Sequence, residues 1–163
     1  MTVVSNSGPL IHLSMGGQVG LIPHLFGEVL VPRTVYREVV EDGAGLPGSA
    51  ELRLASWARV VEVDQASVAP FAAEHLDPGE AAAIALSVQQ KARRLLVDDR
   101  QARNVAGRLG IPVIGTLGIM LAALRGGAIQ RIAPVLDQMT QQGFWLSPQL
   151  ELDILRQAGE DRC

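Results

Sequence analysis

The stretch Leu95-Leu96-Val97-Asp98-Asp99-Arg100 decides the fold. Its aliphatic run ends in two adjacent carboxylates, and a helix-like segment follows at once. Consecutive aliphatic residues bounded by polar ones are typical of a strand buried in a parallel sheet, and open α/β folds bind ligands at the carboxyl ends of such strands. The stretch therefore predicts a strand and a candidate site at its end.

The two adjacent acids have two explanations. Neighbouring carboxylates repel each other unless a cation, an arginine or solvent relieves them, and a divalent metal with oxygen ligands relieves them best. Asp99 is also a good N-cap for the helix beginning near Arg100. The pair alone favours the cap, so other acids must converge on it before a catalytic role is inferred.

Strand-like and helix-like segments alternate along the chain. Short strands are expected at residues 2–5, 28–31, 60–63, 94–97 and 111–115. Apolar residues at helical spacing predict helices around 35–40, 81–88, 102–109, 116–125, 129–142 and 150–155. This alternation predicts an α/β fold with a mostly parallel sheet and helices on both faces.

Length and composition predict one domain over residues 1–163. The chain is long enough for a single core, which its 48% hydrophobic and 4% aromatic residues make aliphatic. The only cysteine, Cys163, excludes an internal disulfide and a thiolate metal cluster, which favours a reducing compartment. With no apolar run near the ~18 residues of a membrane span, we expect a soluble, cytoplasmic protein without a membrane partner.

The segment Asp77-Pro78-Gly79-Glu80 has the features of a helix start. Asp77 is the expected N-cap, Pro78 the first helical residue and Glu80 the capping-box partner. This pattern explains Glu80 without any function. A carboxylate at a helix N-terminus is nevertheless favourable, and it can also turn toward a metal.

Two more polar residues are candidates for the site: Glu38, inside an expected helix, and Asn6, at the end of an expected strand. Glu38 lies in an amphipathic helical pattern and is, by pattern alone, an ordinary surface residue. Asn6 follows the first expected strand, where a parallel sheet presents side chains to its carboxyl-end crevice. Asn6 is also a possible cap or Asx-turn before Pro9, with Ser7 competing for that role.

Other catalytic chemistries find no support in the sequence. The histidines His12, His24 and His75 lack zinc-ligand spacing, and no phosphate-binding glycine motif or nucleophile elbow occurs. The net charge of −3 argues against a general polyanion-binding surface but allows a local basic rim. An oxygen-only set remains: Asn6, Glu38, Glu80, Asp98 and Asp99.

The order of these residues carries a family resemblance over nearly the whole chain. Its segments are Val4-Ser5-Asn6-Ser7-Gly8-Pro9-Leu10-Ile11, Phe26-Gly27-Glu28-Val29-Leu30-Val31-Pro32, Val35-Tyr36-Arg37-Glu38-Val39, Leu76-Asp77-Pro78-Gly79-Glu80-Ala81-Ala82-Ala83-Ile84-Ala85-Leu86, Leu96-Val97-Asp98-Asp99-Arg100-Gln101-Ala102-Arg103, Val113-Ile114-Gly115-Thr116-Leu117-Gly118-Ile119 and Gly143-Phe144-Trp145-Leu146-Ser147. Together they resemble PIN-domain proteins, specifically a PIN-like group related to the VapC toxins of VapBC toxin–antitoxin pairs.

The resemblance implies a three-layer α/β/α sandwich on a mostly parallel sheet and a Mg²⁺- or Mn²⁺-dependent endoribonuclease. The implied catalytic acids are Glu38, Glu80 and Asp99, and the implied metal ligands are Asn6, Glu80, Asp98 and Asp99. Arg100, Arg103 and Thr116 are weaker candidates for contacts to the substrate phosphate.

Asn6 departs from the family pattern, because PIN nucleases generally carry aspartate at the end of the first strand. An amide oxygen still binds a hard cation, but the site loses one negative charge. The alternative function is therefore a catalytically weakened PIN module that binds protein or RNA.

The implied partners are RNA, an antitoxin protein and a second copy of the chain. Single-stranded RNA is the expected substrate form, because an acidic pit requires a splayed strand. The C-terminal helices, about residues 129–158, are expected to pack on the core or on a second subunit of a homodimer.

Overall fold

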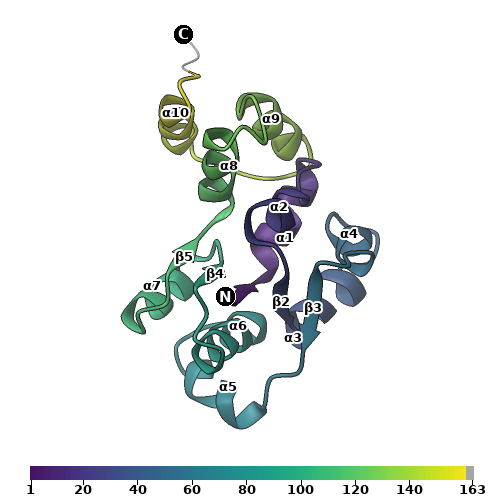
Figure 1. Cartoon of the computed structure of the whole chain (residues 1–163), viewed down its shortest axis with the longest axis vertical. Helices are drawn as coiled ribbons and strands as arrows, with labels where there is room; N and C mark the ends of the chain where they lie inside the picture. The colour runs from purple at the N-terminus through teal and green to yellow at the C-terminus, as the bar shows by residue number, and fades with distance from the viewer. Residues whose placement is uncertain (161–163) are drawn as a thin grey trace.

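The computed structural model describes residues 1–160, and Cys163 lies outside the described residues. Its centre is a five-stranded sheet in which all neighbouring strands are parallel, in the order β3-β2-β1-β4-β5 (Figure 1). The strands are β1 (Val3–Ser5), β2 (Val29–Pro32), β3 (Ala58–Val61), β4 (Arg94–Leu96) and β5 (Val113–Ile114). The predicted α/β class with a parallel sheet is confirmed.

Helices connect the strands and follow the last of them. They are α1 (Ser7–Met15), α2 (Leu21–Phe26), α3 (Arg33–Tyr36), the π-helix η1 (Arg37–Asp42), α4 (Ser49–Arg53), α5 (Gln65–Ala72), α6 (Pro78–Gln89), α7 (Arg100–Arg108), α8 (Thr116–Arg125), α9 (Ala133–Gln141) and α10 (Pro148–Gln157). Figure 1 shows α5, α6 and α7 grouped together, away from α8, α9 and α10.

Two apolar cores lie between the central sheet and the helices that cover its two faces. The smaller core joins the sheet to α6 and α7 through residues such as Ile84 and Val105. The larger core joins it to α1 and α8 through residues such as Leu13 and Ile119 and continues into the C-terminal helices. The chain therefore has the expected α/β/α arrangement.

Strand β4 illustrates how the sheet separates these cores. Leu95 and Val97 belong to the core under α6 and α7, whereas Leu96 belongs to the core under α1 and α8. Successive side chains of a strand point to opposite faces. The alternation continues past the strand, because Asp98 contacts His12 and Thr116 on α1 and α8, whereas Asp99 contacts Glu80 on α6.

Several element boundaries differ from the sequence expectation. The third strand begins at Ala58 rather than Val60, and the fifth is confined to Val113–Ile114. The helix expected from about Ile129 begins only at Ala133, where the nearby Pro134 is compatible with a first helical turn.

The C-terminal helices α9 and α10 pack on the core of their own chain. They place Leu136, Met139, Ile154 and Leu155 in the larger core. Within residues 1–160, no helix combines the length and the apolar character that crossing a membrane requires.

Candidate acidic site at the sheet edge

Asn6 lies directly after β1, at the carboxyl edge of the sheet. Its backbone N–H donates to the carbonyl oxygen of Leu96 at 2.9 Å, which ties it to β4. The residue is only 4% exposed, and its Oδ1 atom accepts no hydrogen bond from the described part of the chain. A buried acceptor without a donor costs about 1–3 kcal/mol, so this oxygen is a candidate ligand atom for a group that the chain alone does not supply.

The backbone places Asn6 at the N-cap of α1, but its side chain makes no capping bond. The interpretation of Asn6 as a side-chain cap is therefore wrong. This outcome leaves its amide oxygen available for another partner.

Glu80 stands at the N-terminus of α6, as the capping-box pattern predicts. The Glu80 N–H donates to Asp77 Oδ1 at 2.7 Å, and the Asp77 N–H donates to Glu80 Oε1 at 2.9 Å. Burial raises the pKa of Glu80 to about 7, and the nearby carboxylates of Asp77 and Asp99 contribute to the increase. The capping role is confirmed, and Glu80 also faces other acids.

Asp99 reaches the same place from β4. Its Oδ2 accepts a hydrogen bond from the Ala102 N–H at 2.9 Å, which confirms the predicted N-cap of α7. Its carboxyl group also lies in hydrogen-bonding contact with Glu80. The Asp99 side chain thus both caps α7 and contacts a second acid, Glu80.

Glu38 is brought to the N-terminus of α6 by the π-helical segment η1. Its half-buried carboxylate accepts hydrogen bonds from the Ser7 side chain and the Gly79 backbone N–H. Burial and the charge of Asp77 nevertheless raise its pKa above the ordinary value. π-helical turns occur often at functional sites. This one places the Glu38 carboxylate against Gly79, the residue that precedes Glu80 in the sequence.

Glycine at position 79 permits this approach. A Cβ atom at Gly79 would collide with Oε1 of Glu38. The glycine in the resemblance segment is thus explained by the close packing of η1 against the start of α6.

The donor set suits a hard divalent cation. Carboxylate and amide oxygens are the ligands that Mg²⁺ and Mn²⁺ prefer. No Lys or Arg among residues 1–160 forms an ion pair with Glu38, Glu80 or Asp99. These described residues do not form a ready-made group of three acidic or histidine ligands, so closing around an ion requires side-chain rotation.

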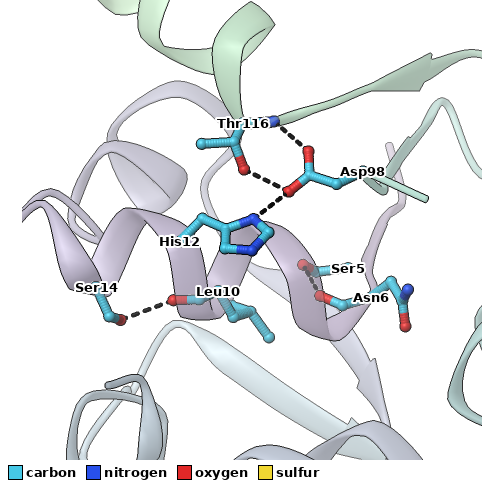
Figure 2. Close-up of polar contacts among 7 residues, drawn as sticks. All are labelled: Ser5, Asn6, Leu10, His12, Ser14, Asp98 and Thr116. Carbon is cyan, nitrogen blue, oxygen red and sulfur yellow. Dashed lines mark hydrogen bonds and ion pairs between the residues drawn. The ribbon is translucent and has the colours of Figure 1, made fainter. Parts of the chain in front are cut away.

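Asp98 lies in a separate polar cluster. Its Oδ1 accepts the Thr116 N–H at 2.6 Å, and its Oδ2 lies 2.6 Å from both Thr116 Oγ1 and His12 Nδ1 (Figure 2). Burial acts to raise the pKa of Asp98, but the hydrogen bonds from His12 and Thr116 hold it below the usual value. Figure 2 shows the Asn6 amide pointing away from this cluster.

The predicted site residues therefore divide into two groups. Asp99 meets Glu80, and Glu38 packs on the adjoining helix turn, whereas Asp98 and Thr116 bind each other. The adjacent acids Asp98 and Asp99 need no shared cation to relieve their repulsion, since Asp98 has its own hydrogen-bond donors in His12 and Thr116.

The two candidate arginines lie on α7, and both are exposed. The guanidinium of Arg103 approaches Gly115: a Cβ atom there would lie 3.0 Å from Arg103 Nη1 and 2.7 Å from Asp98 Oδ1. Arg103 thus stands beside the Asp98 cluster, and Arg100 is the first residue of α7, directly after Asp99.

Sequence reasoning missed His12. The spacing of His12 to the other histidines does not match a zinc site, and its pairing with a residue 86 positions away leaves no local pattern. One feature of the sequence does point to His12 as a site residue. It lies one helical turn beyond Gly8 on α1, and α1 begins directly at the carboxyl edge of β1.

The structure combines an all-parallel α/β fold with oxygen-bearing side chains at the carboxyl edge of its sheet. A family model described as PIN domain (DUF3368) matches residues 2–160, and the chain belongs to this family. PIN domains are generally nucleases and typically bind divalent metals. A comparison with curated proteins gives no match.

Proposed function

We propose that this protein is a Mg²⁺- or Mn²⁺-dependent endoribonuclease that hydrolyses RNA phosphodiesters. The observation that carries the proposal is the buried, unpartnered Oδ1 of Asn6 at the sheet edge where Glu80 and Asp99 also meet. A buried acceptor without a donor, at the same edge of the sheet as two neighbouring carboxyl groups, is what a cation site is expected to look like before the cation binds.

Each side chain has a distinct role in this proposal. Glu80 and Asp99 would hold the ion through their carboxylate oxygens, and Asn6 would hold it through its amide oxygen. Glu38, whose pKa is raised, orients a water molecule and accepts its proton. When bound, the ion supplies charge compensation for the phosphate and lowers the pKa of water.

The substrate proposed for this site is single-stranded RNA. The bases and backbone of a single strand can splay apart to fit a site between strand ends, whereas a duplex holds its backbone in a regular helix. Arg100 and Arg103 follow Asp99 on the exposed side of α7 and are the proposed contacts to phosphate groups.

The proposal is tested by incubating the purified protein with structured and unstructured RNAs and with Mg²⁺ or Mn²⁺. We expect cleavage of unstructured RNA that a chelator abolishes and that Asp99→Asn reduces by at least about a hundredfold, the usual scale for loss of a catalytic acid. Cleavage that persists in Asp99→Asn or in chelator contradicts the proposal.

A second candidate function follows from Asn6 itself. With asparagine in place of the usual aspartate, the site has one negative charge fewer, which favours a weakened module that binds RNA or protein. An Asn6→Asp variant distinguishes the two functions. Inactive wild type with strong metal-dependent cleavage by Asn6→Asp supports the binding module, and full activity of the wild type excludes it.

The family resemblance extends the proposal to a toxin of a toxin–antitoxin pair that forms a homodimer and binds an antitoxin. Growth arrest on expression, relieved by the protein encoded next to it, is the expected behaviour. Sedimentation of a single monomeric species at micromolar concentration contradicts the homodimer.

A further inference from the structure

A cavity of about 320 Å³ opens beside the Asp98 cluster, at the carboxyl end of β5. Its polar wall contains His12, Arg103 and Thr116, and its apolar wall includes Phe144 and Leu146. The volume falls at the lower end of the range of about 300–1,000 Å³ for small-molecule sites. None of the acids assigned to the cation site, Glu38, Glu80 and Asp99, lines it.

The aromatic part of the wall is held in place by hydrogen bonds. The ring of His12 lies 4.8 Å from the ring of Phe144, centroid to centroid, at an interplanar angle of 58°. Asp98 accepts a hydrogen bond from His12 Nδ1, and Thr116 in turn fixes Asp98. These contacts fix the orientation of the His12 ring at the cavity wall. Because Nδ1 is bonded to Asp98, Nε2 is the ring nitrogen left to bond a ligand.

The charged part of the wall is an arginine without an internal partner. The Arg103 guanidinium forms no ion pair or hydrogen bond within residues 1–160, although other arginines such as Arg108 are paired. An unpaired guanidinium is suited to bidentate contact with a phosphate. Aromatic rings beside it are suited to stacking with a base.

We propose that this cavity binds one nucleotide of the RNA, next to the scissile phosphodiester, with its base against Phe144 and His12 and its phosphate on Arg103. The proposal rests on the proposed function of the acidic site. The two sites share a strand end, because Asp98 and Asp99 are consecutive and their Cα atoms lie about 3.8 Å apart. An RNA strand that crosses this edge of the sheet reaches both.

Binding is tested separately from cleavage, by titrating the ¹⁵N-labelled full chain with each of the four ribonucleoside 5′-monophosphates in the presence of a chelator. We expect saturable shifts of the Gly115, Thr116 and Gly118 amides with at least one nucleotide. Arg103→Gln is expected to weaken this binding about tenfold, the scale of one charge-assisted hydrogen bond. Arg108→Gln, on the same helix and outside the cavity, is the matched control and is expected to bind as the wild type does.

The second measurement sequences the cut sites in a random single-stranded RNA treated with Mn²⁺. Phe144→Leu keeps the apolar volume but removes the aromatic ring, so we expect relaxed base preference at one position beside the cut. Unchanged spectra elsewhere in the chain show that the variant is folded.

The outcomes separate the two proposals. Nucleotide binding that depends on Arg103, without any RNA cleavage, keeps the nucleotide cavity and rejects the ribonuclease. RNA cleavage without saturable shifts at Gly115 to Gly118 overturns the cavity proposal and keeps the ribonuclease. Binding that Arg103→Gln and Arg108→Gln leave equally strong also overturns it.

Discussion

The carboxyl groups of Glu80 and Asp99 lie in hydrogen-bonding contact at the edge of the sheet, and each also caps the helix on which it stands. One acid comes from the start of α6 and the other from the N-cap of α7, shortly after β4. A contact of this kind needs a proton or a cation between the two oxygens, which links the site to both pH and metal.

Stability without metal is predicted to fall as pH rises from about 4.5 to about 7. Glu80 has an ordinary pKa of 4.5 and a folded-state pKa of about 7, so in this window the folded chain binds more protons than the unfolded chain. Urea unfolding in chelator at several pH values measures the effect. Glu80→Gln removes the titration and still accepts the Asp77 N–H, so its stability is expected to lack this decline. Parallel pH profiles for both proteins contradict the assignment.

Gly79→Ala is predicted to displace Glu38 from the start of α6. The added Cβ atom would meet the Glu38 carboxylate, so Mn²⁺-dependent cleavage should fall by about tenfold or more, the usual scale for a displaced catalytic acid or base. Gly107→Ala on α7 is the matched control: nothing lies within 4 Å of its Cβ, and helix propensity predicts a gain of about 0.5–1 kcal/mol. Equal cleavage rates for both variants would show that Glu38 does not depend on Gly79.

Asp98→Asn is predicted to destabilise the fold at neutral pH by about 2 kcal/mol. The charged carboxylate accepts bonds from the Thr116 N–H, Thr116 Oγ1 and His12 Nδ1, and hydrogen bonds to charged groups contribute more than neutral ones. Its lowered pKa means that this contribution is present above the ordinary value of 3.8 and is lost as pH falls further.

The control for the Asp98 cluster is Thr140→Val, which removes an exposed hydroxyl bonded only to the Asp137 carbonyl. Its expected effect on the free energy of unfolding is under about 0.5 kcal/mol. Denaturant unfolding of Asp98→Asn, Thr116→Val and the double variant measures the interaction energy. Additive effects of the two substitutions would contradict direct coupling between Asp98 and Thr116.

Glu160 is predicted to stabilise the C-terminal part of the fold. Its carboxylate accepts the N–H groups of Ile132 at 2.6 Å and Ala133 at 3.1 Å, at the N-terminus of α9. Glu160→Ala leaves both donors without this partner and is expected to cost about 1–3 kcal/mol in urea unfolding. Glu160→Gln keeps an acceptor and should cost less; an equal loss in both variants would point to lost charge alone.

Local patterns correctly predicted the parallel sheet and the helix caps at Asp77 and Asp99, but not a side-chain cap at Asn6. The aliphatic run before Asp98 gave β4, and the Asp77-Pro78-Gly79-Glu80 pattern gave the capping box. Both depend on residues that are neighbours in sequence, where steric and hydrogen-bonding preferences act directly. The N-cap of α10 is also local, since the Leu150 N–H donates to the Ser147 hydroxyl three residues earlier.

Contacts between distant segments could not be read from such patterns. The sequence grouped Asp98 with Asp99, but alternation along the strand sends their side chains in different directions, and only the packing of α1 and α8 shows that Asp98 meets His12 and Thr116. The π-helical turn that carries Glu38 also has no signature in the spacing of Val35, Val39 and Val40, which fits an ordinary α-helix equally well.

The most direct test of the central claim is the initial rate of single-stranded RNA cleavage in Mn²⁺ for the wild type, Asp99→Asn and Asp153→Asn. Asp153 lies on α10, where its carboxylate accepts a bond from Gln149, so its variant is a matched change of charge away from the sheet edge. The account predicts cleavage by the wild type and Asp153→Asn and its loss in Asp99→Asn. Equal rates in all three proteins would contradict a metal-dependent ribonuclease site at Asp99.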